Sequence, residues 1–169
     1  MAILPIVTVP DPLLKEISTP VEVVDDALRK LMDDMLETMY AAPGIGLAAV
    51  QVGRPIRLLV MDLAEEDAEP DPQFYVNPEL TWTSDELATY NEGCLSIPEQ
   101  YADIDRPAEC KISYLDYHGV EQMVHATGLF STCIQHELDH LNGIVFIDYL
   151  SALKRGMYVR KVKKLVKEE

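Results

Sequence analysis

The sequence predicts a compact α+β domain, because helical and strand-like hydrophobic patterns alternate along the chain. The chain has 169 residues, of which 48% are hydrophobic, and this is enough for one domain with a full core. We therefore expect a single domain, residues 1–169, in which mainly antiparallel short strands surround a central helix. An amphipathic helix is expected before the strands, and a further helix at the C-terminus.

The N-terminal third is predicted to contain one helix and one strand. Four prolines make residues 1–20 extended or irregular. Apolar residues recur at helical spacing over residues 25–40, which predicts an amphipathic helix whose methionine-rich face packs into the core. The continuous apolar run at residues 56–61 predicts a buried strand.

The rest of the chain is predicted to form short strands, a central helix and a terminal helix. Five apolar or alternating stretches are strand candidates: residues 74–76, 80–82, 87–90, 110–115 and 120–124. Asn77-Pro78 is expected to separate the first two, and a turn at residues 116–119 joins the last two into a hairpin. Residues 144–147 are predicted to form another short strand, and residues 151–167 the terminal helix.

The segment Gln135-His136-Glu137-Leu138-Asp139-His140 is the clearest candidate for a metal site. Two histidines four residues apart on a helix lie on one face and can bind the same ion. Glu137 is then placed to take a proton from a water that the ion activates. Two ordinary core histidines would be the simpler explanation, but the chain has only four histidines, and two of them flank this glutamate.

The flanks of this motif predict a central, largely buried helix. Thr127 is a candidate N-cap, and Asn142-Gly143 is typical of a helix end. Between these positions, apolar residues lie on more than one side of the helix, as expected for an element surrounded by core.

A catalytic metal site also needs a third protein ligand. Cys133 lies on the histidine face, but five residues from the level of the ion, or roughly 7.5 Å along the helix axis. With a metal–sulfur bond of about 2.3 Å its side chain cannot cover that distance, so Cys133 is expected to be a core or pocket thiol. Cys94 lies in a short segment between a glycine and a proline, which can fix a thiolate and a backbone N–H. Spacing alone leaves Cys94, His125 and Asp148 open as the third ligand.

Residues 42–51 form a glycine-containing stretch of small apolar residues that ends at Gln51. The glycine spacing resembles half of a nucleotide-binding fingerprint, but the stretch follows a predicted helix and lacks the third glycine, so nucleotide binding is not expected. Glycines also let another backbone approach closely, which makes this stretch a candidate peptide-binding edge.

Composition narrows the class of function. No apolar run approaches the roughly 20 residues that span a bilayer, and the N-terminal sequence has no signal-peptide pattern, so we expect a cytoplasmic protein without a membrane partner. Three widely spaced cysteines do not form a disulfide framework. The net charge of −15 argues against general nucleic-acid binding, although residues 151–169 carry seven basic and two acidic side chains.

Three segments, taken together, resemble the peptide deformylase family: residues 44–51, Glu92-Gly93-Cys94-Leu95-Ser96 and residues 135–140. Each motif is modest alone, but their order and their spread over almost the whole chain make the resemblance specific. Members of this family remove the formyl group from the N-terminal formylmethionine of newly made proteins and release formate.

The resemblance implies a role for each motif. Three side chains would hold one divalent metal ion, most often Fe²⁺ and alternatively Zn²⁺, Ni²⁺ or Co²⁺: Cys94, His136 and His140. Glu137 would carry the proton, and Gln51 with the Leu95 backbone N–H would stabilise negative charge on the carbonyl oxygen. Glu92 and Arg106 match a charged pair that is expected to brace the metal-binding loop.

The resemblance also implies a path for the peptide. Five residues would contact it, the last two lining the pocket for the methionine side chain: Ile45, Gly46, Gly93, Leu129 and Cys133. The chain departs from common family residues at Tyr90 and Tyr101, near this path, so preference beyond the methionine stays open.

Two other functions are compatible with the histidine–glutamate motif. A zinc endopeptidase usually takes a downstream Glu or His as its third ligand, and the terminal Glu168 and Glu169 are poor candidates. A non-catalytic metal-binding module would leave Glu137 and Gln51 without a function. The basic residues 151–169 are either a solvated helix face or a contact with ribosomal RNA, and we expect a monomer.

Overall fold

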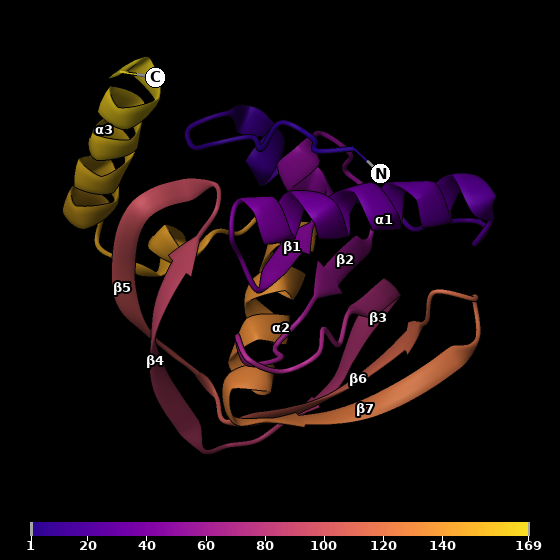
Figure 1. The fold of residues 1–169 in the computed structure, drawn as a ribbon. Coiled ribbons are helices and arrows are strands. Elements are labelled where there is room, and N and C mark those ends of the chain that lie inside the picture. The colour runs from indigo at the N-terminus through magenta and orange to yellow at the C-terminus, as the bar shows by residue number, and fades with distance from the viewer. Residues whose placement is uncertain (1, 169) are drawn as a thin grey trace.

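Two helices, α1 (Asp26–Ala41) and α2 (Gly128–Leu141), pack on opposite faces of one antiparallel sheet in the computed structural model, which describes residues 2–168 (Figure 1). The sheet has five strands, which lie side by side in this order: β1 (Gly46–Ala48), β2 (Leu58–Met61), β3 (Gln73–Thr83), β6 (Glu109–Leu115) and β7 (Glu121–Thr127). The α+β prediction with a central motif helix is therefore confirmed.

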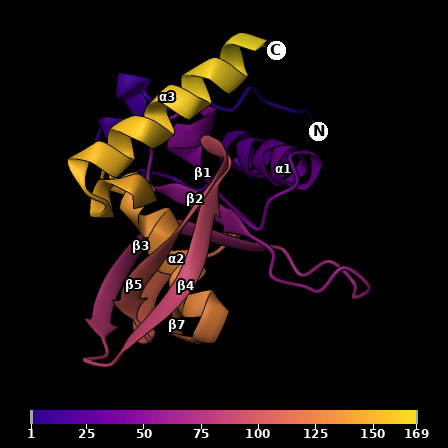
Figure 2. The ribbon, with the colours of Figure 1, turned by 90° about the vertical axis from the view of Figure 1, so that its left-hand side faces the viewer.

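A second, two-stranded sheet forms a long ribbon beside α2. Its strands are β4 (Leu87–Cys94) and β5 (Ile97–Pro107), which pair with each other and with no strand of the larger sheet (Figure 2). The terminal helix α3 (Ala152–Glu168) packs against β5, where Val162 is fully buried. Three short 3₁₀ helices complete the structure: η1 (Pro12–Lys15), η2 (Ala49–Val52) and η3 (Phe146–Tyr149).

The surroundings of strand β2 explain why its sequence is continuously apolar and does not alternate between apolar and polar residues. Leu58 and Val60 pack with α1 on one face of the sheet, while Leu59 and Met61 pack with α2 on the other. All four side chains are buried, as in a strand that is covered by helices on both faces. This sandwich fixes the position of α2 relative to the β1 edge.

Both internal helices begin and end near the predicted residues. Asp25 caps α1, because its carboxylate accepts a hydrogen bond from the Leu28 N–H at 2.9 Å. Asn142 and Gly143, the latter with φ of 76°, end α2 as expected. Thr127 is the N-cap residue of α2 as predicted, and its side chain makes no capping hydrogen bond.

The strand predictions were less accurate. Residues 73–83 form one continuous strand, because a positive φ of 49° at Asn77 and a register shift after Val76 absorb the expected break. Residues 144–147 do not form a strand; their second half belongs to η3. Strand β5 was not predicted, because its 11 residues include two prolines and mostly polar, partly exposed side chains.

Within residues 2–168, every helix is too short or too polar to span a bilayer.

Candidate metal centre

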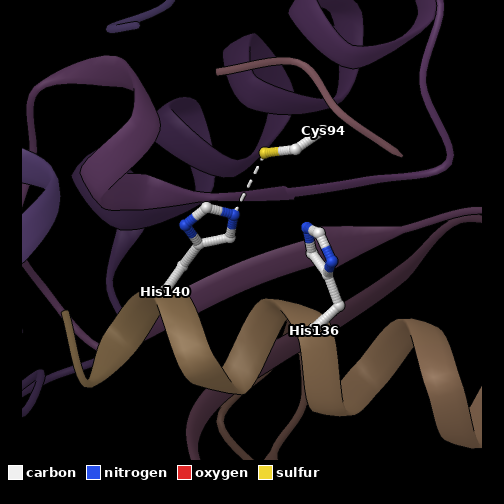
Figure 3. Close-up of side chains that lie close together, drawn as sticks. All are labelled: Cys94, His136 and His140. Atoms are coloured by element: carbon white, nitrogen blue, oxygen red, sulfur yellow. Dashed lines mark hydrogen bonds between the residues drawn. The ribbon is translucent and has the colours of Figure 1, made fainter. Parts of the chain in front are cut away.

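Three side chains converge between α2 and the end of the ribbon. His136 and His140 lie one helical turn apart and rise from the same side of α2, while Cys94 reaches toward them from the end of β4 (Figure 3). Their ligand atoms all lie within 4.8 Å of one another, and the Cys94 Sγ is 3.3 Å from the His140 Nε2. The structure thus brings Cys94 to the histidine pair that the spacing had identified.

This donor set fits a divalent transition metal. One sulfur and two imidazole nitrogens suit zinc or iron, and such a site leaves a position free for a water or substrate. The His136 Nδ1 lies 2.8 Å from the Glu92 Oε1, so Nδ1 carries the proton and Nε2 is left as the donor atom. Burial lowers the pKa of His140 well below its ordinary value, which keeps this imidazole neutral as a metal ligand must be.

The two other candidates for the third ligand lie in different surroundings. His125 is half exposed on β7, and its Nε2 lies 2.9 Å from the Glu109 Oε1. Asp148 in η3 is paired with Lys15 and accepts a hydrogen bond from the Val145 N–H. Neither residue joins the cluster around the histidine pair.

Gln51 is buried at η2 with its amide oriented toward Cys94. The Ala48 N–H donates to the Gln51 Oε1 at 2.9 Å, which fixes the carbonyl on that side. The Gln51 Nε2 therefore faces the site, 3.0 Å from the Ser96 Oγ and 3.4 Å from the Cys94 Sγ. Sequence reasoning gave no role to Ser96, although it lies in the quoted cysteine motif and is fully buried.

Glu137 is buried beside the glycine edge of β1. A Cβ added at Gly46 would lie 3.1 Å from the Glu137 Cγ and Cδ, so only glycine lets the glutamate sit here without displacement. Among the described residues, the Glu137 Oε2 has no hydrogen-bond partner. Burial raises the pKa of Glu137 to about 7, which makes its carboxyl group able to accept and release a proton near neutral pH.

Gln51, Cys94, His136 and Glu137 line a cleft of about 960 Å³ between β1, the ribbon end and α2. All residues that the resemblance placed along the peptide line this cleft: Ile45, Gly46, Gly93, Leu129 and Cys133. Leu95, Tyr90 and Tyr101 line it as well. Ile45 and Leu129 are each about half exposed, so both side chains are accessible to a bound peptide.

Glu92 and Arg106 form the buried ion pair that the resemblance implied. The Arg106 Nε and Nη2 donate to the two Glu92 carboxylate oxygens at 2.6 and 3.0 Å, and both side chains are 5% exposed. Burial opposes ionisation of Glu92, but the hydrogen bonds from His136 and Arg106 outweigh it and hold its pKa below the ordinary value. Asp139 was missed: its Oδ2 accepts a further hydrogen bond from the Arg106 Nη1 at 2.7 Å.

Comparison with known proteins identifies the family. Residues 3–156 match the family model described as Polypeptide deformylase. The chain belongs to this family. The peptide deformylase of Phenylobacterium zucineum is 60% identical over 167 residues, which cover 99% of both chains.

Solved structures agree with the sequence match. The crystal structure of peptide deformylase from Ehrlichia chaffeensis has a TM-score of 0.93 and 47% identity, and covers 99% of this chain and 98% of that one. A second structure from that organism, a complex with actinonin, has the same TM-score at 49% identity, covering 97% of this chain and 98% of that one. The predicted family and activity are thus confirmed: the chain is a metal-dependent hydrolase that removes the N-formyl group from nascent peptides.

Proposed function

We propose that Cys94, His136 and His140 hold Fe²⁺, and that the residues around them cleave formate from the formylmethionine of nascent proteins. The observation that carries this assignment is the convergence of one thiol and two imidazoles within 4.8 Å, with Cys94 and His136 lining the cleft. Thiolate and imidazole also suit Zn²⁺, Ni²⁺ and Co²⁺, so these ions would be able to replace iron in preparations.

The metal, when bound, supplies Lewis acidity that activates a water and polarises the formyl carbonyl. Glu137 accepts the proton that this water loses, because its carboxylate is buried on the cleft side of α2 without a competing hydrogen bond from the described residues at Oε2. Glu137 then returns the proton to the leaving amine, and the formyl group departs as formate.

Negative charge develops on the carbonyl oxygen during the attack. The Gln51 Nε2 is held toward the site by the bond between the Gln51 Oε1 and the Ala48 N–H, so it can donate to this oxygen without reorganisation. The Leu95 N–H, next to Cys94 at the turn between β4 and β5, is the second donor in this proposal.

The cleft suits an extended peptide. Strand β1 pairs with β2 along one edge, and among the described residues no strand covers its other edge, so a peptide can add there as a further strand. Ile45 and Gly46 belong to this edge, and Gly93 lies opposite. Leu129 and Cys133, one turn apart on α2, would line the methionine pocket.

Formate release from a formyl-Met peptide tests the assignment of residues. The protein is purified without oxygen and loaded with Fe²⁺, and its metal content and turnover are compared with those of Cys94→Ser and Glu137→Gln. We expect Cys94→Ser to lose the metal, and Glu137→Gln to keep it while kcat falls by about 10²–10⁴-fold. Cys110→Ser, which alters a buried thiol outside the site, is the matched control and should keep both metal and turnover. Full activity of Glu137→Gln would refute the proton-transfer role.

We also propose that the chain is a cytoplasmic monomer, residues 1–169 forming one catalytic domain, and that α3 contacts ribosomal RNA. Residues 151–169 carry seven basic and two acidic side chains, whereas the preceding 150 residues carry 7 basic and 27 acidic ones. A phosphate backbone would attract α3 and repel the rest of the surface.

Substitution tests the α3 contact better than deletion, because deletion would uncover the core around Val162. Three exposed lysines of α3, Lys154, Lys163 and Lys164, are replaced by glutamine, and pelleting with ribosomes is measured at low and high salt. The expected result is weaker pelleting with a smaller salt dependence. A triple variant at exposed basic residues elsewhere, Lys30, Arg54 and Lys111, should pellet like the unmodified protein.

A further inference from the structure

A chain of hydrogen bonds leads from His136 through the protein to a second pocket, outside the cleft. The His136 Nδ1 contacts Glu92, Glu92 is paired with Arg106, and Arg106 donates to Asp139. At the outer end, the Tyr149 hydroxyl donates to the Asp139 Oδ2 at 2.6 Å. None of the motifs in the sequence includes Tyr149, which lies in η3.

The network carries more negative than positive charge. Arg106 is one cation between two carboxylates, Glu92 and Asp139, and it is only 5% exposed. The excess negative charge falls on Asp139, whose side chain is 18% exposed. The Tyr149 hydroxyl gives this carboxylate a second donor without adding another charge, which lowers the cost of burying the pair.

Tyr149 also contacts the cation directly. The Arg106 Cζ lies 5.3 Å from the centroid of the Tyr149 ring, within the range of a cation–π interaction. Burial, followed by the hydrogen bond to Asp139, raises the pKa of Tyr149 to about 12, so the hydroxyl remains a donor over the physiological range. Tyr149 therefore holds Asp139 by its hydroxyl and Arg106 by its ring.

Tyr149 lies outside the cleft that is proposed to bind the substrate. Tyr149, Arg106 and Asp139 line a pocket of about 580 Å³. The α2 residues that line this pocket are Gln135, Leu138, Asp139 and Asn142, whereas the cleft is lined by Leu129, Thr132, Cys133, His136 and Glu137. Tyr149 does not line the cleft, and the network links it to His136.

We propose that Tyr149 is a positioning residue for the metal ligand His136: through Asp139 and Arg106 it holds the Glu92 carboxylate that orients the imidazole. This inference rests on the proposed metal-binding role of His136. Partners of metal-binding histidines orient the ring and strengthen metal binding, and their loss typically costs roughly 10–100-fold in affinity. Asp139 and Arg106 lie between Tyr149 and Glu92, so a smaller effect is expected.

Dissociation of Zn²⁺ tests the inference without relying on turnover. The Zn²⁺-loaded protein is mixed with an excess of chelator, and the rate of metal loss is measured for the unmodified chain and for Tyr149→Phe, which keeps the ring and removes the hydroxyl. We expect metal loss about three- to tenfold faster in Tyr149→Phe, below the range for direct partners. Tyr117→Phe is the matched control, because the Tyr117 hydroxyl donates to the Asp33 carboxylate at 3.2 Å beside α1, and its metal loss should be unchanged.

A double variant shows whether Tyr149 acts through Glu92. In Glu92→Gln the carboxylate no longer links His136 to Arg106, so adding Tyr149→Phe should change the rate of metal loss no further. With a formyl-Met peptide and saturating metal, Tyr149→Phe should keep the KM of the unmodified chain, because it does not touch the cleft.

Two results would overturn the inference. One is metal loss from Tyr149→Phe at the rate of the unmodified chain, and the other is an undiminished effect of Tyr149→Phe in the Glu92→Gln background. Failure of the proposed metal site looks different, because then the unmodified chain would itself hold no Zn²⁺ and release no formate.

Discussion

The five-stranded body and the β4–β5 ribbon are built by different interactions, and the metal centre joins them. In the body, α2 is held by apolar contacts, with Ile134, Leu138 and Leu141 packed against the sheet. The ribbon has few buried apolar side chains, chiefly Ile97 and Ile104, and it is tied to α2 by hydrogen-bonded charges. Two metal donors therefore depend on the core of the body, while the third, Cys94, depends on the polar contact with α2 and on the small apolar cluster around Ile97.

Because the body and the ribbon are held by different contacts, substitutions in them should affect stability and metal binding to different degrees. The apolar contacts of α2 belong to a tightly packed core, so they fix the position of this helix. The two histidines are thereby fixed relative to the β1 edge. The polar network fixes the ribbon relative to α2, and the same Glu92 carboxylate orients His136. Changes to the network or the ribbon should thus release the metal more readily than equally destabilising changes to the core of the body.

The largest effect is expected from Arg106→Ala. It leaves Glu92 and Asp139 as buried carboxylates without their cation, and such a loss typically lowers the free energy of unfolding by about 3–5 kcal/mol. Denaturant unfolding of the metal-free protein measures this cost. Lys30→Ala, which removes a 73% exposed lysine from its pair with Asp34, is the control and should cost far less, because Asp34 keeps the hydrogen bond from the Ala2 N–H. Equal costs for both variants would contradict the distinct role of the network.

Two fully buried isoleucines compare the ribbon with the body directly. Ile97→Ala in β5 and Ile112→Ala in β6 remove the same atoms from equally buried sites, so each should lower the free energy of unfolding by about 2–5 kcal/mol. Only Ile97 pairs with Cys94 across the ribbon turn. We therefore expect faster Zn²⁺ loss from Ile97→Ala alone, measured with a chelator. Similar metal loss from both variants would show that global destabilisation, and not ribbon position, controls the site.

A smaller, kinetic effect is expected at the body's edge from Gly46→Ala. The new Cβ would lie 3.1 Å from Glu137 and displace its carboxyl group by a few tenths of an ångström, which should lower kcat by about tenfold with metal content unchanged. Turnover of a formyl-Met peptide gives kcat. Gly156→Ala in α3 meets only the end of the flexible Arg160 side chain and should leave kcat unchanged.

The smallest expected effect is a pH dependence of the free energy of unfolding that comes from Asp34 in α1. The hydrogen bond from Lys30, with that from the Ala2 N–H, lowers the pKa of Asp34 below its ordinary value of 3.8. The ionised Asp34 thus stabilises the fold above pH 3.8, and this contribution disappears as the pH falls through the lower pKa of the folded state. Unfolding of Asp34→Asn and the unmodified chain should therefore differ most near neutral pH and converge in acid. A difference that stays constant down to acid pH would exclude this linkage.

Local patterns in the sequence identified the helix pair and two of the metal donors. The motif with His136, Glu137 and His140 is local, because i, i+4 spacing places both imidazoles on one helix face whatever surrounds it. The buried strand β2 was likewise predictable, since its four consecutive apolar residues serve cores on both faces. The assignment of Cys94 needed the family resemblance, because spacing alone left three candidates.

Only the tertiary structure decided how the ribbon meets the helix. Cys94 and His140 are 46 residues apart, Glu92 and His136 are 44 apart, and Arg106 and Asp139 are 33 apart, so no local pattern relates them. Strand β5 is defined by pairing with β4 and not by its own hydrophobicity. Thus the sequence by itself determined which residues have the chemistry of a metal site, and long-range pairing and charge burial decided which of them meet.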